Sequence, residues 1–244
     1  MERFYAMNAI KVKIAGHVGE ICSAHRFSRK MYRDFRIDEP AEYRITLTDE
    51  DIEFSFIQEL VEPIACVKAP QILEKMALAL LPFETILMHG AVVAVNDLCY
   101  MFTAPGGTGK STHVKTWLER CSQAYIVNGD KPFIKFSNDE TPPLACGSPW
   151  AGKENQYTNT MVPLKSIILM ERAEDNRMEQ ITFAQAFPTL LQQVYRPDDE
   201  ENMRRTLKLM QRLPPAVSFW RFHFNNFKDD CFDVAYNALV RGQL

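Results

Sequence analysis

The stretch of this chain with the clearest chemistry is Ala-Pro-Gly-Gly-Thr-Gly-Lys-Ser-Thr at residues 104–112. Glycines allow consecutive backbone N–H groups to turn toward an anion, and the N-terminus of a following helix adds the positive end of its dipole. A lysine in this position reaches the β and γ phosphates, and the serine hydroxyl that follows can ligate magnesium. The strict motif begins with glycine, where this chain has Ala104. The pattern predicts a nucleoside triphosphate site made by Ala104, Pro105, Gly106, Gly107, Thr108, Gly109, Lys110, Ser111 and Thr112.

A triphosphate site also needs a carboxylate, because the bound magnesium neutralises charge on the β and γ oxygens. Asp130 follows a short apolar run at 125–127 and comes twenty positions after Lys110. One helix and one strand fill that interval, so the two strand ends can be neighbours at one edge of a sheet. We therefore predict a metal-binding or catalytic role for Asp130, with an ordinary Asn-Gly-Asp turn as the alternative.

The predicted loop needs a strand before it and a helix after it. Residues 99–102 are an apolar run, and 111–120 are predicted to be helical. Two apolar runs, 91–95 and 98–102, are separated only by Asn96 and Asp97, which predicts a β-hairpin. The strand that feeds the loop should therefore pair antiparallel with its predecessor, unlike in a plain doubly wound nucleotide-binding sheet.

In the rest of the chain, segments with the apolar spacing of a helix alternate with segments that have the spacing of a strand. This pattern predicts an α/β protein with mixed sheets. The basic segment 26–36 is predicted to be a solvated surface, with contact to an anionic substrate as the alternative. Further strands are predicted at 10–14, 43–47, 52–56, 125–127, 133–136, 166–170 and 217–224, and further helices at 69–81, 183–194, 200–213 and 229–241.

Composition narrows the class of protein. Of the 244 residues, 46% are apolar and 24% charged, as in ordinary globular proteins. The net charge of −3 provides no basic field for nucleic acid. No signal peptide or membrane span is apparent, and the six cysteines lack a C-x-x-C pair. We expect a cytoplasmic protein with reduced cysteines and with neither nucleic acid nor membrane as a partner.

Several segments together resemble the HPr kinase/phosphoenolpyruvate carboxykinase superfamily, and within it small bacterial HPr-kinase-like proteins of unassigned substrate. The segments are Met-His-Gly-Ala at 88–91, Ser-Thr-His at 111–113, Asp-Lys-Pro at 130–132, Gly-Ser-Pro-Trp-Ala-Gly-Lys at 147–153, 162–165, 170–172 and 195–197. The resemblance covers residues 87 to the C-terminus. It implies a P-loop core of the carboxykinase-like fold at 83–244. The alternating runs before this core predict a β-rich subdomain at 1–82 packed on it, with one continuous domain as the alternative.

The resemblance also implies roles for individual residues. Lys110 would bind phosphate, Ser111 and Asp130 would bind magnesium, and Asp130 would match one acid of the family's acidic pair. His89 corresponds to a histidine beside those acids, and Lys153 lies on a loop that would close over the phosphates. Gly129 stands where the family usually has the other aspartate. Either the general base is lost, or His89 or Glu154 replaces it.

These roles imply an ATP- and magnesium-dependent kinase that moves the γ-phosphate to a hydroxyl of a protein, peptide or small molecule. The alternative is a nucleotide-binding regulatory protein with weak catalysis, and removal of phosphate at the same site is a third possibility. The family likeness also makes a homo-oligomer plausible. Restoring the acidic pair with Gly129→Asp is the substitution expected to separate an enzyme from a regulator.

Overall fold

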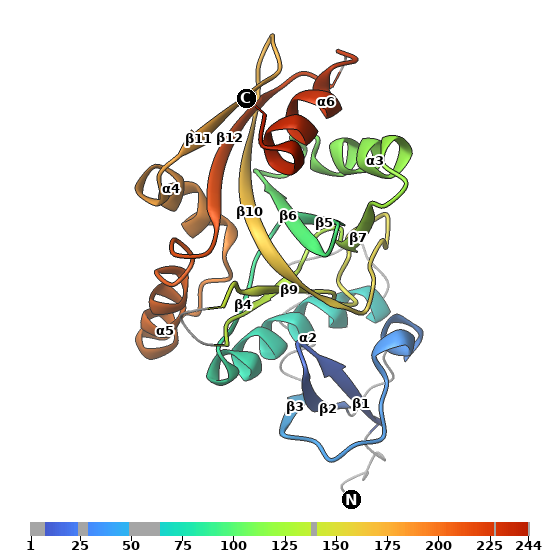
Figure 1. The fold of residues 1–244 in the computed structure, drawn as a ribbon. Coiled ribbons are helices and arrows are strands. Elements are labelled where there is room, and N and C mark those ends of the chain that lie inside the picture. The colour runs from blue at the N-terminus through green and yellow to red at the C-terminus, as the bar shows by residue number, and fades with distance from the viewer. Residues whose placement is uncertain (1–7, 24–28, 49–63, 138–140, 227, 244) are drawn as a thin grey trace, which may run out of the picture. The chain divides into compact units, whose positions relative to one another are not determined.

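The computed structural model describes residues 8–23, 29–48, 64–137, 141–226 and 228–243 (Figure 1). Contacts divide the chain into two compact units, Met1–Phe83 and Glu84–Leu244. Both parallel and antiparallel strand pairs occur together with helices, so the predicted α/β class with mixed sheets is confirmed. None of the described helices is long and apolar enough to cross a bilayer. The packing of the first unit on the second stays a prediction.

The first unit contains a small sheet in the order β1-β2-β3, one 3-10 helix and one long helix. β1 and β2 form an antiparallel hairpin, and β3 lies parallel to β2. The strands predicted at 10–14 and 43–47 are confirmed, whereas 52–56 lies outside the described residues. The elements are β1 (Asn8–Ile14), β2 (His17–Ser23), η1 (Arg29–Phe35), β3 (Tyr43–Leu47), α2 (Ile64–Leu80) and η2 (Leu81–Phe83).

Helix α2 follows the predicted pattern. Its buried residues Ile72, Met76 and Leu80 recur every four positions, which gives the helix one apolar face. The Tyr43 hydroxyl lies 2.9 Å from the Met76 sulfur and connects the helix to β3. The helix ends at Leu80, and Pro82 lies in the 3-10 turn η2, as predicted. Of the basic segment, residues 29–35 form η1, and 26–28 lie outside the described residues.

The described part of the second unit contains a nine-stranded sheet whose main path is β4-β8-β9-β10-β6-β5-β7. β12 pairs with β10 and carries β11 on its other side. The strands are β4 (Thr85–Leu87), β5 (Ala91–Val95), β6 (Leu98–Thr103), β7 (Tyr125–Asn128), β8 (Phe133–Lys135), β9 (Leu144–Cys146), β10 (Met161–Arg172), β11 (Arg177–Ile181) and β12 (Ser218–Phe224).

The predicted hairpin is confirmed. β5 and β6 pair antiparallel, and the connecting Asn96 and Asp97 have φ angles of 51° and 61°. Both residues are thus left-handed, as the type I′ turn of a two-residue hairpin requires. β5 also pairs antiparallel with β7, so β6 and β7 run in the same direction. Their carboxyl ends therefore lie at the same edge of the sheet.

Strand β10 is the long strand at the centre of this sheet (Figure 1). Its first residues pair antiparallel with β9, and the remainder pairs parallel with β6 on one side and β12 on the other. The strand predicted at 166–170 is thus much longer, because Pro163 and Lys165 interrupt the apolar pattern without ending the pairing. The short strands β4 and β9 and the charged β11 carry no comparable pattern and were not predicted.

The described helices of this unit are α3 (Lys110–Arg120), α4 (Phe183–Gln193), α5 (Glu200–Met210), α6 (Cys231–Tyr236) and the π-helical turn η3 (Asn237–Arg241). All of the predicted helices are present, but the one at 200–213 ends at Met210. The one at 229–241 begins at Cys231 and loosens into η3. α3 and α6 lie side by side (Figure 1).

His113 anchors α3 in the core. Its ring is fully buried beside Phe102 and Phe222, and its Nε2 accepts a hydrogen bond from the Trp117 indole at 3.1 Å. Burial lowers the pKa of His113 to about 3, so the imidazole is neutral at physiological pH. The unfolded chain takes up a proton at this ring below its ordinary pKa of 6.5, and the folded chain does not.

We therefore predict that His113 makes the fold less stable as pH falls from 6.5 toward 3. Between pH 7.5 and 5.0 its share of the lost unfolding free energy should be about 2 kcal/mol. Urea unfolding gives the free energy of unfolding of wild type and of His113→Gln at both pH values. The share of His113 is the loss between pH 7.5 and 5.0 in wild type minus the loss in the variant. Equal pH dependences in the two proteins would contradict the prediction.

Candidate functional site

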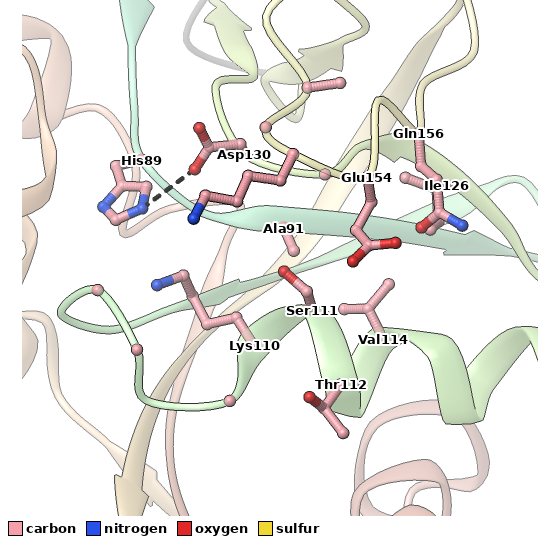
Figure 2. Close-up of a pocket in the computed structure, with 17 residues that line it drawn as sticks. His89, Ala91, Lys110, Ser111, Thr112, Val114, Ile126, Asp130, Glu154 and Gln156 are labelled. Carbon is pink, nitrogen blue, oxygen red and sulfur yellow. Dashed lines mark ion pairs between the residues drawn. The ribbon is translucent and has the colours of Figure 1, made fainter. Parts of the chain in front are cut away.

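A cavity of about 480 Å³ lies at the carboxyl edge of β6 and β7 (Figure 2). The loop between β6 and α3, the first turns of α3, the segment after β7 and the loop at 151–156 line it. All four residues predicted to be catalytic line the cavity: Asp130, Lys110, His89 and Lys153. Of the residues predicted to bind the cofactor, Gly106, Gly107, Gly109, Lys110, Ser111 and Thr112 line it, whereas Ala104, Pro105 and Thr108 do not.

The loop after β6 has the backbone that its glycines predict. Gly109, directly before α3, has a φ of 120°, which side chains rarely tolerate. A Cβ there would lie 2.9 Å from the Asn226 amide nitrogen and 3.3 Å from the Phe224 ring. Ala104 is buried in the core at the end of β6, where a methyl group fits, and this accounts for alanine at the first position of the motif.

Lys110 lies in the first turn of α3 and folds back over its own loop. Its ammonium group donates to the carbonyl oxygens of Ala104 at 2.8 Å and Pro105 at 3.2 Å. Burial lowers the pKa of Lys110, and the carboxylate of Asp130 opposes that shift. Ala104 and Pro105 thus serve the loop through their carbonyl groups.

The side chain of Asn128 holds Asp130 in place. Asn128 is fully buried at the end of β7, and its Oδ1 accepts hydrogen bonds from the backbone N–H of Asp130 at 2.9 Å and of Lys131 at 2.7 Å. Its Nδ2 donates to Ser148 Oγ at 3.0 Å. The sequence marked Asn128 only as a turn former, yet this side chain joins β7 to the loop that begins at Gly147.

His89 contacts Asp130 directly. Backbone hydrogen bonds tie residues 88–90 to 130–132, and His89 Nε2 lies 3.2 Å from Asp130 Oδ1 (Figure 2). His89 Nδ1 lies 2.8 Å from Oε1 of Gln193, the last residue of α4. Gln193 therefore orients the imidazole. No sequence motif includes Gln193, which lies 104 positions from His89, so its role was not predicted.

The surroundings of Asp130 keep it ionised. Burial raises the pKa of Asp130. The hydrogen bond from His89 and the positive charges of Lys131, His89 and Lys110 lower it by more than burial raises it, so the pKa lies below the ordinary value. A carboxylate with a lowered pKa is a weak general base, because its affinity for a proton is small. The same carboxylate is well suited to bind a cation.

Gly129 occupies a position with no room for a side chain. A Cβ there would lie 2.9 Å from the Ala151 carbonyl oxygen and 3.2 Å from that of Gln156. The N–H of Gly129 donates to the same Gln156 oxygen at 2.9 Å. Gly129→Asp is therefore not the simple restoration expected from the sequence, because an aspartate would have to displace the loop at 151–156.

That loop is anchored at its start and lines the cavity at its tip. Trp150 is buried and packs on Phe133, and its carbonyl accepts from the N–H of Lys131. Glu154 pairs with Lys115 of α3 at 3.2 Å. Its carboxyl group faces the side chain of Ser111 (Figure 2). The segment is therefore anchored in the core at Trp150 and lines the cavity from Ala151 onward.

Two oxygen-bearing side chains in the cavity lining suit magnesium. In the described part of the chain, no group of three or more histidine, cysteine or acidic side chains could hold a metal by itself. Magnesium typically takes one or two carboxylates and completes its shell with waters and substrate phosphates. The Ser111 hydroxyl and the Asp130 carboxylate, both in the lining of one cavity, fit that requirement.

Comparison with known proteins gives little beyond this geometry. Neither protein-family models nor curated protein sequences match the chain. Among solved structures, it is similar to the HPr(Ser) kinase/phosphatase from Coxiella burnetii, with 11% sequence identity and a TM-score of 0.39. The match covers 64% of this chain and 88% of the other. At that level the family stays a prediction from the sequence.

The crowding at Gly129 can be tested with a single methyl group. We expect Gly129→Ala to lower the free energy of unfolding by about 1–3 kcal/mol, because the methyl group must push the 151–156 backbone away. Gly106→Ala is the matched control, since nothing lies within 4 Å of a Cβ at that position. Urea unfolding compares the two variants, and equal stabilities would show that position 129 has room.

Proposed function

We propose that this protein is an ATP- and magnesium-dependent phosphotransferase that moves the γ-phosphoryl group to a hydroxyl of a protein, peptide or small molecule. One observation carries the proposal: a single cavity is lined by the glycines of a phosphate-type loop, by Lys110 and Ser111, and by the ionised Asp130. Phosphoryl transfer needs little more than positioning and charge stabilisation, which these groups can provide.

The roles follow from where each group lies. The loop N–H groups and the N-terminus of α3 bind the phosphates, and Lys110 leaves its two carbonyl partners to contact the β and γ oxygens. Ser111 and Asp130 would hold magnesium, which supplies charge neutralisation across the phosphate oxygens. Lys153, from the loop opposite, contributes a second cation to the transferred group. The same loop excludes water from the cavity.

Glu154 is the better candidate for the general base. The lowered pKa of Asp130 makes it a poor proton acceptor. Both ring nitrogens of His89 have partners, Asp130 and Gln193, whereas only one oxygen of Glu154 pairs with Lys115. Glu154 faces Ser111 from the opposite wall of the cavity, where it is half exposed and can meet an incoming hydroxyl (Figure 2). Its ion pair with Lys115 fixes the direction of the carboxylate.

The lack of room at Gly129 favours the second candidate, a nucleotide-binding regulatory protein. An enzyme that uses two adjacent acids cannot be rebuilt at that position without moving a neighbouring loop. If Glu154 does not act as a base, the site would bind nucleotide and magnesium with little transfer. The two functions share Lys110 and Asp130 and differ in turnover alone.

The direct test is transfer of label from γ-labelled ATP with magnesium, with and without an extract of the host cells. We expect a labelled protein or metabolite, and a loss of at least about 100-fold in Lys110→Ala and in Asp130→Asn. Arg204→Ala is the control, because Arg204 pairs with Glu200 on α5 and does not line the cavity. ATP binding by wild type with no label transferred would favour the regulatory protein, and no binding would contradict both.

A second experiment tests the base. Glu154→Gln should reduce kcat by about 100-fold or more while the affinity for ATP changes little, since the carboxylate acts on the acceptor. Glu119→Gln, on the exposed surface of α3, is the matched control. A weakened ATP affinity with unchanged kcat would place Glu154 in nucleotide binding instead of proton transfer.

A further inference from the structure

Arg172, the last residue of β10, binds the backbone of the phosphate-type loop. Its Nη2 donates to the carbonyl oxygen of Gly107 at 2.8 Å, and its Nε donates to that of Thr108 at 3.2 Å. The guanidinium thus holds two successive carbonyl groups with two neighbouring N–H donors. Arg172 is not among the residues that line the cavity, so it holds the loop from outside.

The parallel pairing of β10 with β6 brings Arg172 to this position. Leu169 is opposite Thr103, the last residue of β6. Beyond this pair, β10 continues for three more residues, whereas the segment after β6 turns into the loop. Glu171 is engaged by Arg221 at 3.1 Å. Among the described residues, no carboxylate pairs with Arg172, and its guanidinium donates to the two loop carbonyls instead.

The direction of the carbonyl groups sets the direction of the N–H groups. In a planar trans peptide, the carbonyl of one residue and the N–H of the next point in opposite directions. With the carbonyls of Gly107 and Thr108 turned to Arg172, the N–H groups of Thr108 and Gly109 turn away from it. In the part of the chain that the structure describes, the N–H of Gly109 takes part in no hydrogen bond, whereas the N–H of Thr108 closes a turn over residues 106–107.

We propose that Arg172 is a positioning residue that fixes the loop backbone at Gly107 and Thr108 and thereby presents the N–H of Gly109, which lines the cavity, to a polyphosphate anion. This inference rests on the proposed nucleotide site and extends it to a residue outside the cavity. An anion gains most from donors that already point toward it, because no reorganisation is then needed on binding. Arg172 provides that order before the ligand arrives.

The test separates this role from simple charge attraction. Isothermal titration with Mg·ADP and with inorganic pyrophosphate is run on wild type, Arg172→Ala, Arg172→Lys and the control Arg204→Ala. We expect Arg172→Ala to weaken both ligands by about tenfold or more. Arg172→Lys should not restore binding, because one ammonium point charge cannot match the fork that holds two carbonyls. Full binding by Arg172→Lys would show that charge alone matters and would overturn the inference.

A second measurement needs no ligand. The heteronuclear ¹⁵N–¹H NOE of the 106–109 amides should fall in Arg172→Ala and stay at the wild-type value in Arg204→Ala. Unchanged loop order in Arg172→Ala overturns the inference alone. If wild type binds Mg·ADP and Arg172→Ala binds it with the same affinity, the inference is also overturned alone. A wild type that binds neither ligand overturns the proposed function instead. If Arg172→Ala does not fold, Arg172→Lys and Arg172→Gln are used for both measurements.

Discussion

Strand β5 runs antiparallel to both of its neighbours, and the candidate site depends on that constraint. Because β6 and β7 consequently point the same way, the loop after β6 and the segment after β7 meet at one edge of the sheet. β5 starts at this edge, so His89, two residues before it, arrives beside Asp130. β10 is parallel to β6 and ends at the same edge, which brings Arg172 to the loop. A ligand site at the carboxyl ends of parallel strands is a general outcome of such topologies.

Local patterns in the sequence were enough to predict the loop, the hairpin and most helices. The Asn96-Asp97 turn and the helix after Lys110 depend on residues within a few positions of each other, and both are present as predicted. The contacts of Gln193 with His89 and of Arg172 with Gly107 join residues 104 and 65 positions apart, and no local pattern encodes them. The crowding at Gly129 likewise depends on a separate segment, so no local pattern predicts that this position lacks room for a side chain.

The charges of the site are uneven in a way that matters for its chemistry. His89, Lys131 and Lys110 lower the pKa of Asp130, the carboxylate among them, and that carboxylate therefore stays ionised at neutral pH. The second carboxylate, Glu154, lies across the cavity and is paired with Lys115. Two acids with such different surroundings are suited to different tasks, as the proposed roles of Asp130 and Glu154 require.

The close approach of the Ala151 carbonyl to Gly129 couples two segments of the candidate site. A side chain at position 129 must displace the backbone at 151–156, and Glu154 belongs to that segment. A substitution at 129 therefore affects the carboxylate that faces Ser111 as well as the neighbouring Asp130. Position 129 and the facing wall of the cavity cannot be varied independently of each other.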